Sequence, residues 1–223
     1  AYAADMVFGE YLSFLHPNRI TRITVLIIIL GLFSAIYTYF GGLSSVVRTD
    51  IVQFLVLLSG GLVVMFMAIH HLGGWSALYT KTPQLMHLHL PWDHEKLPWT
   101  HIFGLFLLNI NYWCANQSIV QRSLAAKNLK HAQIGLMVGG LMKYLMAMII
   151  VVPGIALVGI LGENGLSDPD MSFPYLVNTY LPMGAKGLVL CALFASLMST
   201  VDSTFNSLAT LWSVDIFKEY LHK

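Results

Sequence analysis

The sequence predicts an all-α integral membrane protein, because of its composition and the length of its apolar runs. Hydrophobic residues make up 57% of the 223 residues and charged residues only 10%, whereas a soluble domain usually carries about 25% charged residues. The apolar residues gather in runs long enough to cross a bilayer as helices. A net charge of +1 without a basic run gives no sign of a nucleic-acid partner and leaves the lipid bilayer as the expected surroundings.

Five apolar runs give five expected transmembrane helices, which together form one transmembrane domain over residues 1–223. Their ranges are about 23–40, 51–72, 102–120, 135–161 and 187–212. The pair Gly41-Gly42 ends the first run, and Pro153-Gly154 is expected to break the fourth, because proline removes a backbone donor from a helix. Residues 1–20 are either the tail of a preceding span or a surface segment. With no initiator methionine and no signal peptide, the sequence is expected to be a fragment of a larger protein.

The connections between the runs alternate in charge, and this predicts the orientation. Two short connections, 41–50 and 121–133, share a basic character that comes from Arg48, Arg122, Lys127 and Lys130. The two longer connections, about 73–101 and 162–186, carry five of the eleven acidic residues. Because short cytoplasmic loops carry an excess of Lys and Arg, we expect the short connections in the cytoplasm and a multi-pass protein in the plasma (inner) membrane.

The fifth run carries a row of oxygen-bearing side chains that a lipid-facing helix lacks. On a helical period they fall within about 120° of one another, and they are Ser196, Ser199, Asp202, Ser203, Asn206 and Thr210. A carboxylate at mid-membrane costs about 2.5–3.5 kcal/mol, and hydroxyls beside one carboxylate suit a hard cation such as sodium. The alternative is helix packing, in which small hydroxyl residues hydrogen-bond across a close contact.

A second polar group combines amides, aromatic rings and a lysine. One broad face of the third run, at i, i+3, i+4, i+7 spacing, holds Asn109, Tyr112, Trp113 and Asn116. Lys143 lies about two turns into the fourth run. Rings that stack on C–H faces, beside amide and ammonium donors, suit a sugar. The alternatives are an interfacial aromatic belt and, for Lys143, a side chain that snorkels to the interface.

Asp50 and the loop histidines have simpler explanations as well. Asp50 opens the second run, where the helix dipole favours an acidic residue; alternatively, it faces Asp202 and shares its cation. The histidines before the third run lack the spacing of a metal motif, and they are His87, His89, His94 and His101. The sequence offers no paired nucleophile and base, so we expect neither an enzyme nor a cofactor.

Four stretches together resemble the sodium:solute symporter family, and within it the sodium/glucose cotransporter branch. They are residues 38–53, residues 112–128, Lys143 with Val152-Pro153-Gly154, and residues 195–220. The resemblance covers nearly the whole chain from about residue 23. It implies a leucine-transporter-type fold of two inverted five-helix repeats. The five runs would be core helices four to eight of that fold, and the third run would be discontinuous.

The resemblance also implies ion sites. The family's conserved sodium site carries over to the main-chain carbonyl of Ser196 and to Ser199 and Thr200, with its other half on a first core helix that this chain lacks. A second sodium site, present in some members, matches Asp50, Ser199, Asp202 and Ser203. Asp202 departs from the Thr or Ala often found in this branch, so the sequence leaves open whether it binds sodium or a proton.

Substrate contacts of the family carry over to Asn109 and Lys143, with Tyr112 as an inner gate and Trp113 beside it. The implied function is sodium-coupled symport of a small polar solute, most naturally a sugar, by alternating access. Other solutes (inositol, sialic acid or an amino acid) and a sodium-gated channel or sensor are the alternatives. We expect no transport by these 223 residues alone, because half of the sodium site and half of the inverted repeat would be missing.

Overall fold

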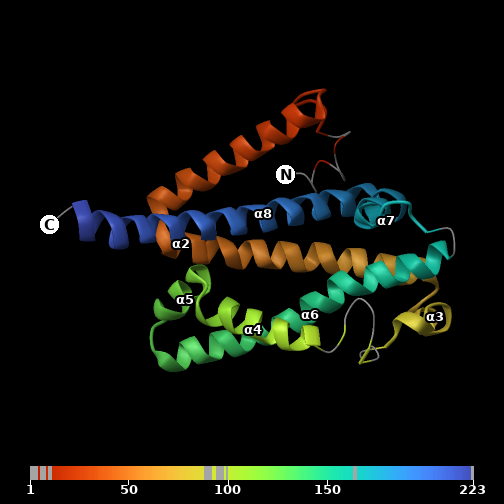
Figure 1. The fold of residues 1–223 in the computed structure, drawn as a ribbon. Coiled ribbons are helices and arrows are strands. Elements are labelled where there is room, and N and C mark those ends of the chain that lie inside the picture. Colours follow the sequence, from red (N-terminus) through yellow and green to blue (C-terminus); the bar gives the residue numbers. More distant parts are fainter. Residues whose placement is uncertain are drawn as a thin grey trace. The chain divides into compact units, whose positions relative to one another are not determined.

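The computed structural model describes Asp5, Gly9 and residues 12–87, 92–93, 98, 100–162 and 165–221. Within these residues the regular structure is helical and no strand occurs, which confirms the predicted all-α class. Contacts divide the chain into two units, Ala1–Thr82 with Met146–Lys223, and Pro83–Leu145. Figure 1 labels the helices of both.

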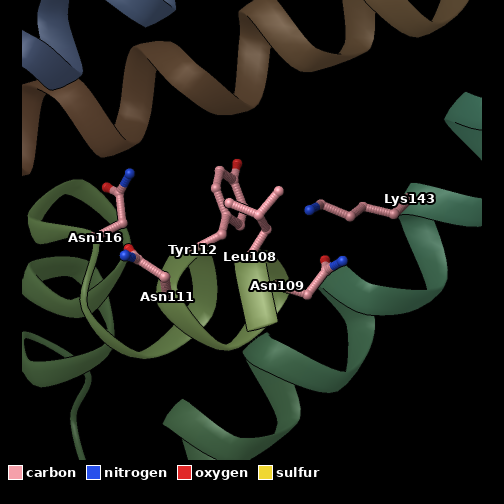
Figure 2. Close-up of a pocket in the computed structure, with 6 residues that line it drawn as sticks. All are labelled: Leu108, Asn109, Asn111, Tyr112, Asn116 and Lys143. Carbon is pink, nitrogen blue, oxygen red and sulfur yellow. The ribbon is translucent and has the colours of Figure 1, made fainter. Parts of the chain in front are cut away.

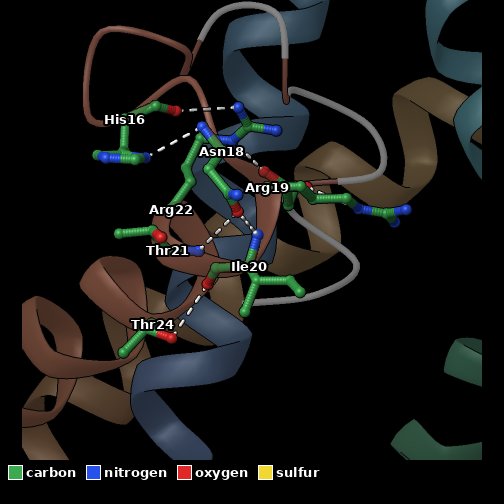
Figure 3. A network of polar contacts seen from close by, with 8 residues as sticks. His16, Asn18, Arg19, Ile20, Thr21, Arg22 and Thr24 are labelled. Atoms are coloured by element: carbon green, nitrogen blue, oxygen red, sulfur yellow. Dashed lines mark hydrogen bonds and ion pairs between the residues drawn. The ribbon is translucent and has the colours of Figure 1, made fainter.

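A polar cap starts helix α2 (Arg19–Leu72). The side-chain oxygen of Asn18 accepts hydrogen bonds from the backbone N–H groups of Ile20 at 2.9 Å and Thr21 at 3.4 Å, as Figure 3 shows. These bonds satisfy two of the donors that the first turn of a helix leaves without intrahelical partners. The helix therefore begins a few residues before the predicted apolar run.

A charged cluster ties the segment before α2 to its first turn. The Arg22 guanidinium donates to the backbone carbonyl of His16 at 3.2 Å and to the Asp5 carboxylate, which also accepts from Arg19 at 3.2 Å. Only 1% of the Asp5 side chain is exposed. The hydrogen bond from Arg22 holds the pKa of Asp5 below its ordinary value, against the opposing effect of burial.

Helix α2 consists of two arms, a first arm over 19–41 and a second arm over 43–72. They meet at Gly42, whose φ of 56° and ψ of −158° suit glycine, and the chain turns back there in Figure 1. The arms match the first two predicted runs. The predicted connection over 41–50 is wrong, because the residues after Gly42 are helical. Thr49 donates its hydroxyl to carbonyls one turn back, at 2.9 and 3.1 Å, and so fits into the helix.

Helix α8 (Met183–Leu211) packs against both arms of α2. Leu26 of the first arm and Val189 of α8 are buried in one hydrophobic cluster. The second arm approaches most closely at Gly60, where a Cβ would lie 2.7 Å from the Cβ of Ala192. Glycine at this position lets the two backbones come this close.

Shorter helices complete the two units. Around α2 and α8 lie α3 (Trp75–Lys81), a 3₁₀ turn (Pro169–Met171), α7 (Ser172–Tyr180) and a π-helical continuation of α8 (Trp212–Leu221). Pro83–Leu145 contains a 3₁₀ turn (Pro83–Leu85), α4 (Thr100–Cys114), α5 (Gln117–Leu124) and the first part of α6 (Leu129–Leu161).

The third predicted run is interrupted, and the fourth is not. Between α4 and α5, the side chain of Asn116 caps α5 by accepting from the backbone N–H of Ser118 at 3.0 Å. The expected break at Pro153 is wrong, because α6 continues through this buried residue. Packing on both sides of the proline, with Val152 and Ala156 buried, holds the helix together despite the lost hydrogen bond.

Three of the described helices are long and apolar enough to cross a membrane, namely α2, α6, and α8 with its π-helical continuation. Helix α4 has 15 residues, fewer than a single crossing needs. The bent α2 supplies two of the five predicted runs, and α4 with α5 supplies a divided third. The count of five crossings therefore stays a prediction.

Candidate functional site

Asp202 of α8 is buried against the first arm of α2. Its side chain and that of Ser34 are both 0% exposed, and the Ser34 hydroxyl donates to Asp202 Oδ1. The other carboxylate oxygen, Oδ2, is buried and accepts no hydrogen bond from the described residues. Leaving a buried acceptor unpaired costs about 1–3 kcal/mol, and more if it is charged. This oxygen is therefore a candidate position for binding a cation or a proton.

Asp50 contacts α8 from the second arm. The Ser199 hydroxyl donates to Asp50 Oδ1 at 2.5 Å, and the Ser203 hydroxyl donates to the carbonyl of Ser199 at 2.6 Å. The structure thus joins three residues of the predicted second sodium site, and it gives the fourth, Asp202, a partner on the other arm. Asp50 lies two turns inside the second arm, so it is not the helix cap considered as an alternative.

The residues expected at the conserved sodium site adjoin one another on α8. The hydroxyl of Thr200 donates to the carbonyl of Ser196 at 3.0 Å. Thr200 is exposed, whereas Ser196 and Ser199 are half-buried. A bound ion could draw the Thr200 hydroxyl away from this carbonyl and take both oxygens as ligands. The two oxygens lie on the same side of α8.

Further polar atoms of α2 are buried without a hydrogen bond from the described residues, among them Tyr37 Oη, Thr38 Oγ1 and Gln53 Oε1. Thr38 lies one turn beyond Ser34, on the same face of the first arm. The sequence reasoning missed Ser34 and Thr38. The available signal was a pair of hydroxyl residues four positions apart within an otherwise apolar run.

A cavity of about 440 Å³ lies in the second unit, and its lining residues converge from α4, the α4–α5 junction and α6, as Figure 2 shows. Its lining consists of Leu108, Asn109, Asn111, Tyr112, Asn116 and Lys143. The Asn109 side-chain nitrogen donates to the carbonyl of Leu105 at 2.8 Å. That bond fixes the amide and leaves its oxygen to accept from a ligand.

Lys143 lies over the two aromatic rings of α4. Its Nζ is 4.0 Å from the ring centroid of Tyr112 and 4.6 Å from that of Trp113. The two rings meet edge to face, with centroids 5.8 Å apart. These cation–π contacts favour the cavity-facing position of the lysine over the snorkelling alternative. The four residues predicted to contact substrate are thereby brought together, although Trp113 is not among the residues that line the cavity.

The cavity is rich in hydrogen-bond donors and lacks acidic residues. Between Glu95 and Glu163 the sequence contains no Asp or Glu. Amide, phenol and ammonium groups beside aromatic rings can bind the hydroxyls and the C–H faces of a polar solute. A cationic solute would find no countercharge in this stretch of the chain.

The two described loop histidines, His87 and His101, belong to neither of these groups of residues. His89 and His94 lie outside the described residues, whereas His87 and His101 lie within them. Among the residues that the structure describes, no group of three His, Cys, Asp or Glu side chains is placed to hold a metal ion.

Comparisons with known proteins agree on one family. The sequence model of the "Sodium:solute symporter family" matches residues 13–223. A "Sodium/glucose cotransporter" of Vibrio parahaemolyticus is 33% identical over 95% of this chain and 44% of its own length. "Sodium/glucose cotransporter 4" of Mus musculus is 34% identical over 86% of this chain and 33% of its own length. "Sodium/myo-inositol cotransporter 2" of Sus scrofa is 34% identical over 91% of this chain and 35% of its own length.

A solved structure shares the fold. The substrate-bound outward-open state of a Na⁺-coupled sialic acid symporter superimposes with a TM-score of 0.82 at 24% identity. The match covers 98% of this chain and 47% of that one. The chain thus spans less than half the length of these three relatives and of the sialic acid symporter.

Proposed function

The chain belongs to the sodium:solute symporter family, and from that premise we propose that it forms part of a sodium-coupled symporter for a small polar solute, with a sugar as the favoured substrate. The observation that carries this proposal is the convergence of Asn109, Tyr112 and Lys143 on one cavity beside the interrupted α4–α5 helix. Interrupted helices expose backbone groups that can bind substrate within a membrane.

The proposed conserved sodium site uses the main-chain carbonyl of Ser196 and the hydroxyls of Ser199 and Thr200. Their placement on consecutive turns of α8, with the hydroxyl of Thr200 3.0 Å from the Ser196 carbonyl, supports a shared ion. Sodium prefers several oxygen ligands, and neutral oxygens supply them without excess charge. By analogy with the family, the rest of the shell would come from a helix outside this chain.

A second sodium site is proposed at Asp50, Ser199, Asp202 and Ser203. The hydrogen bond between Ser199 and Asp50 supports its centre, and the unpaired Oδ2 of Asp202 supplies one further acceptor. Because Asp202 bonds to Ser34, its entry into this site requires a rotation of its side chain or a movement of α8 between the arms.

The proposed substrate contacts are hydrogen bonds from Asn109 and Lys143 to the sugar, with Tyr112 as an inner gate and Trp113 beside it. The relatives named for glucose and myo-inositol support a neutral polyhydroxylated solute. The similar sialic acid symporter makes an anionic sugar the second candidate, and Lys143 is the cation that would pair with it.

Transport would proceed by alternating access on a leucine-transporter-type fold, of which these residues would supply core helices four to eight. Sodium binding would favour the outward-open state, and each ligand would raise the affinity for the other by the same factor. Entry of one positive charge contributes about 2.3 kcal/mol per 100 mV of membrane potential.

The test is solute uptake by proteoliposomes that contain the protein encoded by the full reading frame of this chain. A panel of glucose, galactose, myo-inositol, sialic acid and proline is offered in sodium and in choline. We expect concentrative uptake of a sugar in sodium alone. Sodium currents without accumulation of any solute would contradict symport and favour a channel or sensor.

A further inference from the structure

Two threonines of α2 use their hydroxyls in the manner usual for a helix, and a third does not. Thr24 and Thr49 donate to carbonyls one turn back, at 3.0 and 3.1 Å, as threonine commonly does inside a helix. Thr38 Oγ1 is buried and has no hydrogen-bond partner among the described residues. A buried polar atom without a partner destabilises the fold, and a ligand that contacts this oxygen would remove that cost.

Thr38 lies on the same face of the first arm as Ser34, one turn further along the helix. The Ser34 hydroxyl donates to Asp202 Oδ1 across the contact with α8. In Figure 1 the first arm and α8 run in the same direction and converge toward the bend at Gly42. Thr38, between Ser34 and the bend, therefore lies where the contact with α8 continues.

The carboxylate of Asp202 is the charged group in this contact. Asp202 is 0% exposed, and its Oδ2 accepts no hydrogen bond from the described residues. The described Lys, Arg and His side chains form no ion pair with it. Because buried charges in proteins are paired or bind metal ions, the position of this carboxylate favours a bound cation.

The two hydroxyls of the first arm suit a cation beside this carboxylate. A hydroxyl has two acceptor lone pairs besides its donor, so Ser34 can donate to Asp202 and still offer its oxygen to an ion. Thr38 makes no bond that an ion would have to break. Helix packing alone favours hydroxyls that bond across the contact, which describes Ser34 but leaves Thr38 unexplained.

We propose that Ser34 and Thr38 are ligands of the second sodium ion, which they bind together with Asp202. This inference rests on the proposed second sodium site and adds to it two residues of the first arm. The ion can then contact Asp202 in the orientation that the structure shows, before the side-chain rotation that contact with the group around Asp50 requires. Bound sodium links the first arm of α2 to α8.

Binding of radioactive sodium to the purified product of the full reading frame tests this, with Thr38→Val as the main variant. Valine keeps the branched shape and breaks no hydrogen bond of the described residues, so a merely structural role predicts no loss of sodium. We expect the wild type to bind two sodium ions and Thr38→Val to bind one of them about tenfold more weakly. The matched control is Thr24→Val, at an exposed position of the same arm, and it is expected to bind both ions as the wild type does.

Ser34→Ala is expected to weaken binding of the same ion about tenfold, and Ser34→Thr, which keeps a hydroxyl, is expected to restore it. Thermal unfolding in sodium and in choline gives a second readout, because a ligand that binds the folded protein raises its unfolding temperature. The rise caused by sodium should shrink in Thr38→Val, while the unfolding temperature in choline stays at or above the wild-type value.

If the wild type binds two sodium ions and neither Thr38→Val nor Ser34→Ala weakens either of them, this inference alone is overturned. A wild type that binds a single sodium ion would overturn it as well and leave the proposed conserved sodium site standing. Absence of sodium binding by the wild type would contradict the proposed symport itself and this inference with it. Should Ser34→Ala fail to fold, Thr38→Val still decides, because it removes no hydrogen bond of the described residues.

Discussion

The contact between α2 and α8 and the cavity between α4 and α6 hold opposite kinds of polar group. The first gathers oxygens, including the carboxylates of Asp50 and Asp202, each bonded to a serine hydroxyl. The second gathers N–H donors and aromatic rings, with Asn109, Tyr112 and Lys143 around the same space, and it lies in a stretch of sequence without acidic residues.

In the proposed function, the first region would bind the ion and the second would bind the solute. Oxygens with partial or full negative charge suit a small cation, whereas amide and ammonium donors beside rings suit the hydroxyls of a polar solute. A change in either region should therefore alter one ligand's binding before the other's.

The largest effect is expected from Ser199→Ala, which removes the one hydroxyl shared by both proposed sodium sites. A lost hydrogen bond or ligand to a charged group costs about 1.5–3 kcal/mol, so the sodium concentration for half-maximal uptake should rise at least tenfold. Uptake measured over a range of sodium concentrations gives this half-maximal value. The control is Thr210→Ala, whose hydroxyl donates to the carbonyl of Asn206 at 2.8 Å outside both sites; an equal shift there would remove Ser199 from the site.

Lys143→Met should act on the other region. It keeps an unbranched side chain against Tyr112 and Trp113 but removes the ammonium, so the solute KM should rise about tenfold for one lost charge-assisted hydrogen bond. Sodium activation at saturating solute should remain as in the wild type. If the sodium concentration for half-maximal uptake shifts by as large a factor as the solute KM, the two regions are not functionally distinct.

Gly60→Val tests the packing that positions the oxygens. Since a Cβ at Gly60 would lie 2.7 Å from that of Ala192, the added side chain should push α8 from the second arm and destabilise the protein by about 1–3 kcal/mol. Gly187→Val is the control on α8, because a Cβ there has no neighbour within 4 Å. Thermal unfolding in detergent should separate the two variants; equal unfolding temperatures would contradict the close approach.

The smallest effect is expected from the charged cluster before α2. Its hydrogen bond from Arg22 lowers the folded pKa of Asp5, so the pair stabilises the fold above the ordinary carboxyl pKa of about 3.9. That stabilisation is lost as the pH falls through this value toward the folded pKa. The thermal unfolding temperature, measured as a function of pH, should fall more steeply toward acid pH in the wild type than in Asp5→Asn. Parallel curves would contradict the pairing.

The sequence predicted the helical class, because apolar runs depend on local patterns. It also grouped the residues of the cavity between α4 and α6, whose role in binding a solute stays a prediction. Apolar runs set the helices, and the spacing of Asn109, Tyr112 and Trp113 on one helix face placed them together. Lys143 joined them because the resemblance placed it in the same site, and the structure puts it over the rings.

The errors arose where the structure depends on backbone geometry or on packing between segments that are distant in the sequence. A single glycine at positive φ, Gly42, replaced the expected ten-residue connection over 41–50. Pro153 stayed within α6 because buried neighbours hold that helix. Ser34, 168 positions from its partner, could not be paired with Asp202 from one sequence, since periodicity along α8 does not reveal which arm of α2 it faces.

Solute affinity measured in sodium and in choline, for the wild type, Ser199→Ala and Lys143→Met, tests the division between the two regions most directly. Isothermal titration on the purified product of the full reading frame provides it. The wild type should bind solute more tightly in sodium, and Ser199→Ala should bind with the choline-level affinity in both salts. Lys143→Met should bind more weakly in both salts and keep the sodium stimulation. Retention of full sodium stimulation by Ser199→Ala would contradict the division of ion and solute between the two regions.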